Sequence, residues 1–167
     1  MMLPVWLTLL AAFVSPLCAL SSALFSARVA HHMLLVAVAA PLLAASLPAD
    51  RGGGGRALLP ALAGAQAVLL WFWHAPPPYA AALGSDVLYW LMELSLLLPA
   101  LLLWRAVLSP ERPAGPVLAA LLFTTMQMGL LGALLTFAGQ PLYAPHLATT
   151  APYGLSPLED QQLAGLI

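Results

Sequence analysis

Long apolar stretches alternate with short breaks of proline, glycine, serine or charged residues along this chain. Five of the stretches approach the length of about 20 apolar residues that a helix needs to cross the hydrocarbon core of a bilayer. The breaks include Pro76–Pro78, since consecutive prolines cannot continue a helix, and a flexible connector at Gly52–Gly55. The pattern therefore predicts five membrane-spanning helices, at about residues 3–22, 29–47, 57–74, 87–108 and 116–138.

The closing segment, GLSPLEDQQLAGLI, predicts the start of a sixth helix at Pro157. Ser156 is expected to be its N-cap and Glu159 the reciprocal partner in a capping box, with Pro157 at the first helical position. Residues 157–167 extend only about 16 Å at 1.5 Å per residue. That length is half a bilayer, so we expect a truncated or partly represented chain.

Composition supports a membrane environment. Hydrophobic residues make up 62% of the chain, charged residues only 7%, and the mean hydropathy is +0.95, whereas a soluble domain is about a quarter charged. We therefore predict an all-α membrane protein in a lipid bilayer, with residues 1–167 as a single transmembrane helical domain. The net charge of -1 leaves no basic patch for nucleic acid, and the single Cys18 excludes an internal disulfide framework.

The first stretch has an alternative interpretation as a cleaved signal peptide. Signal peptides begin with a basic region, but no Lys or Arg precedes Arg28, although Ser21–Ala23 is a passable cleavage site. A retained span is the favoured interpretation.

The arginines orient the predicted bundle. Arg51 and Arg56 lie between the second and third spans, and Arg105 and Arg112 lie at the edges of the loop between the fourth and fifth. On the opposite side only Arg28 is found. Because cytoplasmic loops are enriched in Lys and Arg, the sequence predicts a cytoplasmic N-terminus.

This orientation places every histidine on the outer side. His31 and His32 open the second span, His74 closes the third, and His146 follows the fifth. Arg28 and His32 are four residues apart and share a helix face, while His31 points about 100° away.

Glu93 lies about two turns into the fourth span. An ionisable side chain at that depth is costly unless it is paired or faces a wet cavity, and is a functional candidate by default. The alternative is that Glu93 pairs with Arg28 or a hydroxyl group only to hold helices together. Both interpretations place Glu93 inside the bundle, with a partner from another span.

Aromatic residues gather at the same outer level. An interfacial aromatic belt is expected there, and we favour a belt over a cofactor-stacking role. The residues concerned are Trp71, Trp73, Tyr79, Tyr89 and Trp90.

Four segments resemble, in the order of their occurrence, the signature blocks of the CtaG family of cytochrome c oxidase assembly factors: ARVAHHMLLVAVAAPLL, WFWHAPPPYAAAL, MGLLGALLTFAGQPLY and GLSPLEDQQLAGLI. The resemblance begins near Phe25, and the W-H-x-P-x-x-Y and D-Q-Q-x-x-G blocks are its specific parts. Membership would imply a bacterial inner-membrane protein that helps to make an active haem-copper oxidase, at the copper-insertion step. Its partners would be a cytochrome c oxidase subunit or other oxidase assembly proteins.

Some positions depart from the family pattern, and others match it. Family members often open the second span with two histidines four apart, where this chain has Arg28 and His32. A Glu-His pair typical of the fourth span is Glu93–Leu94 here. The positions that match their blocks are His74, Tyr79, Gly129, Gly132, Tyr143, Asp160 and Gln161.

The resemblance directs attention to copper, and imidazole and thioether groups suit Cu(I). A delivery protein must release its metal, so an incomplete site of two or three ligands is sufficient. We expect Asp160 to orient one imidazole as a hydrogen-bond acceptor rather than to bind metal. The alternative is that the histidines are interfacial residues with satisfied hydrogen bonds. The expected ligands of the transient Cu(I) site are His32 and His74, with His31 or His146 and with Met33.

Two other functional classes stay open. One is a structural accessory subunit bound stably to a respiratory oxidase without its own metal. The other is a membrane enzyme or transporter, but the sequence has no G-x-S-x-G or H-E-x-x-H pattern, and its ionisable groups cluster at span ends rather than near the midplane, where transporters bind substrate. We therefore expect no enzymatic activity.

The predicted orientation has a direct test. A cysteine placed within Gly52–Gly55 should react with an impermeant thiol reagent only from the cytoplasmic side, because this loop is predicted to be cytoplasmic. Labelling from the outside would overturn the orientation, and with it the outer location of the histidines.

Overall fold

The computed structural model describes residues 2–48 and 58–167, and these residues are helical throughout apart from connecting turns. Arg51, Arg56 and the Gly52–Gly55 connector lie outside the described residues. The elements, in chain order, are α1 (Met2–Phe13), α2 (Pro16–Ala23), α3 (Phe25–Met33), the π-helical segment η1 (Leu34–Ala39), α4 (Ala40–Ser46), α5 (Leu58–His74), α6 (Pro76–Leu83), α7 (Asp86–Val107), α8 (Ala114–Phe137), the short 3₁₀ turns η2 (Ala144–His146) and η3 (Ala151–Tyr153), and α9 (Pro157–Leu166).

Within residues 2–48 and 58–167, three helices are long and apolar enough to cross a membrane alone. They are the continuous helix Phe25–Ser46, made of α3, η1 and α4, together with α7 and α8. The pairs α1–α2 and α5–α6 qualify as bent units, with bends of 41° and 73°, which raises the count to as many as five. The predicted all-helical membrane bundle is confirmed in class, while the five-span count and the N-terminal orientation stay predictions.

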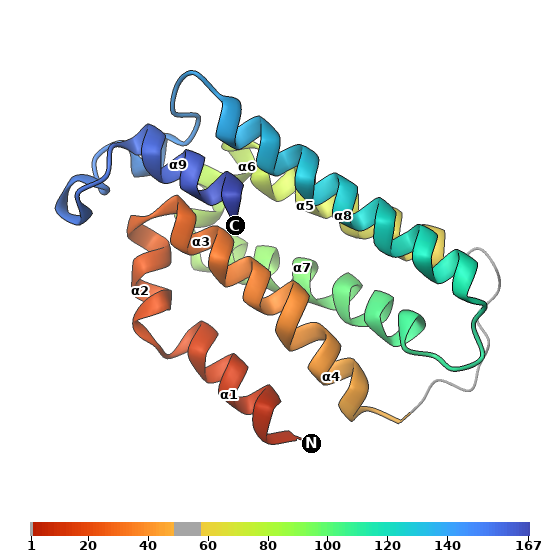
Figure 1. The fold of residues 1–167 in the computed structure, drawn as a ribbon. Helices are drawn as coiled ribbons and strands as arrows, with labels where there is room; N and C mark the ends of the chain where they lie inside the picture. Colours follow the sequence, from red (N-terminus) through yellow and green to blue (C-terminus); the bar gives the residue numbers. More distant parts are fainter. Residues whose placement is uncertain (1, 49–57) are drawn as a thin grey trace.

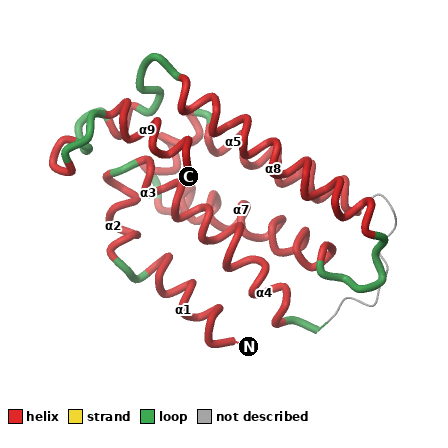
Figure 2. The backbone as a smooth tube through the Cα atoms, in the orientation of Figure 1, coloured by secondary structure: helices red, strands yellow, loops and turns green. Residues whose placement is uncertain are grey.

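The long helices run alongside one another as a bundle (Figures 1 and 2). Helix α5 packs against α7 and α8, and α4 packs against α7. Helix α9 lies over the beginning of α3 and the end of α8, at the end of the bundle where α6 is also found (Figure 1). The histidine-bearing ends of α3 and α5 therefore share one end of the molecule, with the α7–α8 loop at the other (Figure 1).

One predicted helix start differs from the structure, and one predicted break contains a further helix. The second span begins at Phe25 rather than residue 29, so Arg28 lies inside a helix and is 2% exposed instead of lying in a loop. Local sequence hides this start because Leu24, at the N-cap position, provides no side-chain hydrogen bond. The prolines at 76–78 end α5 as predicted, but they also open α6, since proline is tolerated in the first turn of a helix.

A π-helical turn interrupts the second span directly after its histidines. The N–H of Ala40 donates to the carbonyl of Leu35, five residues earlier. Pro41 has no N–H and its ring would clash with the carbonyl four residues before it in a regular α-helix, so the wider turn relieves that contact. The Trp104 indole N–H of α7 donates to the Val36 carbonyl at 3.0 Å.

The predicted aromatic belt is correct only in part. Trp90 is 50% exposed, as a belt residue should be, but Trp73 and Tyr79 are buried. Trp73 donates its indole N–H to the Ser95 hydroxyl at 2.7 Å. Both buried rings therefore stabilise the bundle interior.

The predicted capping box of the last helix is confirmed. The Glu159 N–H donates to Ser156 Oγ at 3.2 Å, and the Ser156 N–H donates to Glu159 Oε2 at 2.7 Å. The Glu159 carboxylate accepts this hydrogen bond from the Ser156 backbone, which lowers the pKa of Glu159 below its usual value. Pro157 is the first helical residue, as expected.

Helices α8 and α9 approach each other at a pair of glycines. A Cβ added to Gly132 would lie 2.6 Å from the carbonyl oxygen of Gly165, and one added to Gly165 would lie 2.5 Å from the carbonyl oxygen of Gly132. Only residues without a side chain permit this separation, so the two glycines determine how closely α9 lies against α8.

Gly132→Ala should therefore lower the thermal stability of the protein in detergent, by about 1–3 kcal/mol as in other overpacked interiors. Gly129→Ala is the matched control, one turn earlier on the same helix, where an added Cβ meets nothing within 4 Å. Thermal unfolding of the two variants should separate them clearly. Equal stability of the two variants would contradict the close packing of α9.

Candidate functional site

A cluster of ionisable side chains lies between α3 and α7 at the end of the bundle covered by α9. Arg28 Nη1 donates to Glu93 Oε1 at 3.3 Å, and Arg28 Nε donates to the carbonyl of Ser21 at 3.1 Å. His31 Nε2 lies 3.3 Å from Glu93 Oε2, and His32 Nε2 lies 3.4 Å from Glu93 Oε1. One carboxylate thus faces a guanidinium group and two imidazoles. The sequence predicted a partner for Glu93 from another span, with Arg28 as one candidate, but not the two imidazoles.

This cluster is almost entirely shielded from solvent. Glu93 is 1% exposed and His31 is 0% exposed. Both ring nitrogens of His31 and of His32, and Glu93 Oε2, are buried without a hydrogen-bond partner among the described residues. Unsatisfied buried polar atoms are costly, so this end of the bundle retains capacity to bind a ligand.

His74, at the end of α5, extends the cluster. Its ring lies 5.5 Å from the ring of His32, centroid to centroid, in an edge-to-face arrangement. Its Nδ1 lies 2.8 Å from the carbonyl oxygen of Leu70. Because a carbonyl oxygen can only accept, the neutral ring carries its proton on Nδ1 and keeps a lone pair on Nε2.

A cavity of about 530 Å³ opens beside these two histidines. Its lining is mainly apolar, and it includes His32, His74, Met33, Gln66 and Met128. A second cavity, of about 220 Å³, is lined by Arg28 and by Cys18, Ser22, Asp86 and Tyr89 among others. Two members of the buried cluster thus border cavities: His32 borders the larger, mainly apolar one, and Arg28 borders the smaller one.

His146 is not part of the buried cluster. Its Nε2 lies 2.7 Å from the Tyr79 hydroxyl, and its Nδ1 lies 3.1 Å from the carbonyl oxygen of Ala23. The carbonyl fixes the proton on Nδ1, so Nε2 accepts from Tyr79 and no nitrogen is left free. Burial lowers the pKa of His146 below its usual value, which keeps this loop imidazole neutral.

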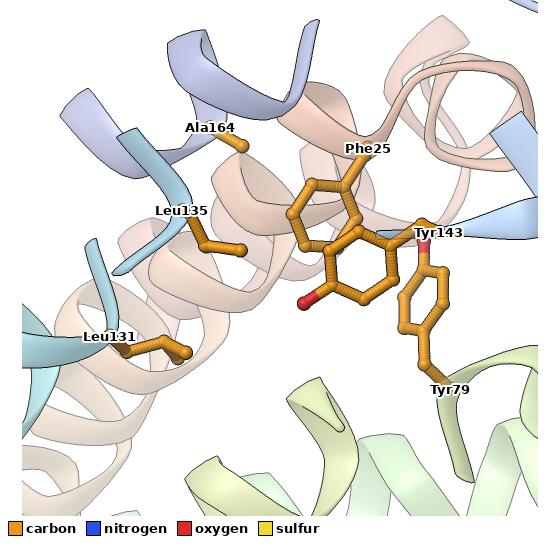
Figure 3. Packing of buried hydrophobic residues seen from close by; sticks show 6 residues of the cluster. All are labelled: Phe25, Tyr79, Leu131, Leu135, Tyr143 and Ala164. Atoms are coloured by element: carbon orange, nitrogen blue, oxygen red, sulfur yellow. The ribbon is translucent and has the colours of Figure 1, made fainter. Parts of the chain in front are cut away.

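Tyr79 packs with Phe25 and Tyr143 in an aromatic group at the same end of the bundle (Figure 3). The His146 ring lies 5.7 Å from the Tyr79 ring, centroid to centroid. Phe25 stacks on Tyr143 with 3.8 Å between ring centroids, and Tyr79 meets both rings edge-on. The Tyr143 hydroxyl donates to the His74 carbonyl at 2.7 Å, and burial raises the pKa of Tyr143. Tyr143 therefore links the loop after α8 to the histidine at the end of α5.

Asp160 and Gln161 connect α9 to its neighbours. Asp160 was expected to orient an imidazole, but its oxygens accept from Phe25 N–H, Ser26 N–H and the Ser26 hydroxyl instead. Gln161 accepts from the Leu142 N–H at 2.7 Å and donates to the Leu135 carbonyl at 3.3 Å. Asp160 thus caps α3, while Gln161 holds the loop that follows α8.

The structure brings together only part of the predicted ligand set. His31 and His32 contact Glu93, His74 contacts His32, and Met33 lines the same cavity as His32 and His74. Among residues 2–48 and 58–167, no group of three or more His, Cys, Asp or Glu side chains is arranged to hold a metal ion. A complete ligand cage is therefore not preformed in the described part of the chain.

Sequence reasoning missed several residues that shape the site. The guanidinium carbon of Arg28 lies 5.0 Å from the centroid of the Tyr89 ring, a cation–π contact, and Ser21 supplies a carbonyl acceptor. Ser26 was missed because its partner lies 134 residues away. The one available signal was that Leu24, which precedes α3, cannot cap a helix with its side chain, so the cap had to come from elsewhere in the protein.

These features define a multi-spanning helical membrane protein with a buried cluster of arginine, glutamate and histidine at one end. A family model described as cytochrome c oxidase caa3 assembly factor (Caa3_CtaG) matches residues 3–167, so the chain belongs to this family. Neither a curated protein nor a solved structure matches it. Membership in this family indicates a role in cytochrome c oxidase assembly. It also implies interaction with the oxidase or with its assembly machinery.

The Arg28–Glu93 pair should behave as an energetically coupled unit. Removing one partner of a buried ion pair costs about 3–5 kcal/mol, because the other charge is left unpaired. Arg28→Gln and Glu93→Gln should each destabilise the protein in detergent, and the double variant should lose less than the sum of the two. Unfolding free energies in a double-mutant cycle measure this coupling.

Arg105→Gln is the control for that cycle. Among the described residues, Arg105 donates a hydrogen bond to the Pro48 carbonyl at 3.5 Å and forms no ion pair. Strict additivity of Arg28→Gln and Glu93→Gln would show that the pair contributes nothing. Oxidase maturation is measured in parallel, because a double variant that restores stability but not maturation would assign the Glu93 charge a role beyond holding helices together.

Proposed function

We propose that this protein assists copper insertion during cytochrome c oxidase assembly, by holding Cu(I) transiently at the histidine-bearing end of its bundle. In this proposal it spans the bacterial inner membrane with that end outward. Copper is cargo here, received and then released to an oxidase subunit or another assembly protein. The His32–His74 pair beside the 530 Å³ cavity is the observation that carries the proposal.

The donor chemistry at this pair fits Cu(I). The Nδ1 hydrogen bond of His74 to a backbone carbonyl leaves Nε2 as a lone-pair donor, which is the usual arrangement of a metal-binding imidazole. Neither ring nitrogen of His32 makes a hydrogen bond with the described residues, although Nε2 lies 3.4 Å from Glu93 Oε1. Met33 and Met128 line the same cavity and provide the thioether groups that Cu(I) accepts.

Charge also favours a monovalent ion. Arg28 and Glu93 neutralise each other next to His32, so one Cu(I) would add a single positive charge to an otherwise neutral region. A monovalent ion costs less to desolvate in apolar surroundings than a divalent one. Two imidazoles without a preformed cage also allow the ion to leave, as delivery requires.

His32→Ala and His74→Ala, made separately, should each weaken Cu(I) binding in detergent by more than about tenfold, the loss that even outer-shell changes around a metal can cause. Copper content and activity of the oxidase in the same membranes should fall together. Cu(I) affinity is measured by competition with a chromophoric chelator.

His146→Ala is the matched histidine control, because both nitrogens of that ring are already hydrogen-bonded. It should retain the parental Cu(I) affinity in the folded fraction. If both His32→Ala and His74→Ala bind copper and mature the oxidase like the parent, the site does not exist. Stable co-purification with the oxidase in equal amount, without copper, would instead favour an accessory subunit.

A further inference from the structure

Helix α3 begins without a cap of its own. Leu24 occupies the N-cap position with φ -121° and ψ 131°, and its apolar side chain makes no cap hydrogen bond. The first N–H groups of any helix lack intrahelical partners, and within a membrane bundle there is little water to satisfy them. Phe25 and Ser26 are 1% and 5% exposed, so their N–H groups require an acceptor from the protein.

Asp160 of α9 is that acceptor. Its Oδ2 accepts from the Phe25 N–H at 2.6 Å, and its Oδ1 accepts from the Ser26 N–H at 3.2 Å and the Ser26 hydroxyl at 2.5 Å. A carboxylate at this position also faces the positive end of the helix dipole. Asp160 is 0% exposed, so it is a cap supplied from a helix distant in the sequence.

The capped helix carries the buried cluster. Arg28 follows Ser26 within the first turn, and His31 and His32 lie about 9 and about 10.5 Å beyond Phe25 along the axis at 1.5 Å per residue. Backbone hydrogen bonds join the successive turns of α3, so a shift of the first turn moves the rest of this short helix with it. The position of the first turn therefore determines where the two imidazoles meet Glu93 and His74. A displacement at Phe25 is thereby transmitted to His32.

Helix α9 is itself held firmly enough to act as a support. Gln161 bonds to the backbone at Leu135 and Leu142, and Gly165 lies against Gly132. The capping box closes the first turn of α9. Asp160 therefore projects from a fixed helix, and its acceptor position is fixed with it.

From these contacts we infer that Asp160 is a positioning residue for the histidine site: it caps α3 from α9 and so sets where His31 and His32 lie. This inference rests on the proposed function for its copper consequence, but not for its structural readout. Both carboxylate oxygens are used by α3, so Asp160 acts through the helix rather than as a ligand. This role requires a carboxylate, because both acceptor oxygens are used.

Three variants test the inference: Asp160→Asn, Leu24→Asp and their combination. Asparagine replaces one acceptor oxygen with an N–H₂ group, which then faces a donor of Phe25 or Ser26. Leu24→Asp places a carboxylate at the N-cap of α3 itself, where the extended backbone already suits an N-cap. The double variant therefore moves the cap from α9 to α3.

Two measurements on metal-free protein in nanodiscs report the outcome. Amide hydrogen exchange at Phe25 and Ser26 should be about fivefold or more faster in Asp160→Asn, the effect of losing a typical cap. The ¹⁵N imidazole resonances of His31 and His32 should shift in the same variant. The exchange at Ser26 and the imidazole resonances should return toward the parental values in the double variant, because an N-cap carboxylate at position 24 can accept from the N–H of Ser26, the second helical residue. Cu(I) affinity should fall and recover in parallel.

Glu159→Gln is the matched control. Glu159 precedes Asp160 on the same helix, but its carboxylate is used within the capping box and does not touch α3. It should leave the exchange of Phe25 and the imidazole resonances unchanged. If Asp160→Asn does not fold, Ser26→Ala is measured instead, since it removes one of the three donors and should give the same changes at smaller size.

Unshifted imidazole resonances in Asp160→Asn, or resonances that Leu24→Asp does not restore, would overturn the inference. Failure of the proposed function has a different signature. In that case the metal-free imidazole resonances would still shift and recover, while the parent protein and the His32→Ala and His74→Ala variants would not differ in copper binding.

Discussion

An ionised carboxylate inside a membrane bundle has to be balanced by a nearby cation, and the Arg28–Glu93 contact satisfies this requirement. The pair joins α3 to α7 where neither side chain reaches solvent. Its geometry draws His31 and His32 to the same carboxylate, and His74 packs against His32. Adjacent imidazoles thus occur where the charges of Arg28 and Glu93 neutralise each other.

The contacts of helix α9 explain why the D-Q-Q-x-x-G segment has these residue types. Asp160 supplies acceptors to the first turn of α3, Gln161 supplies an acceptor and a donor to the end of α8 and its loop, and Gly165 permits contact with Gly132. Each residue type is required by a different neighbour. Together they hold three segments in place around the aromatic group of Phe25, Tyr79 and Tyr143 (Figure 3).

Local features were predictable from sequence, and non-local ones were not. The Ser156–Glu159 capping box involves residues three apart, and the break at Pro76–Pro78 follows from proline chemistry, so both were predicted. The helical position of Arg28 depends on a cap from Asp160, which local sequence does not contain. The interior location of Trp73 and Tyr79 depends on neighbours from other helices. Belt residues and buried aromatics have the same composition, so residue type alone could not separate them.

The bond between Asp160 and Phe25 joins residues 135 positions apart, which has a consequence for biogenesis. During synthesis α3 enters the bilayer long before α9 emerges from the ribosome, and for that interval its first N–H groups lack their acceptor. The cluster of Arg28, Glu93 and the histidines reaches its final geometry only when α9 docks. If Asp160 positions α3 as inferred, nascent chains and prematurely ended products do not present a finished histidine site, and completion of the chain precedes any binding of the proposed copper cargo.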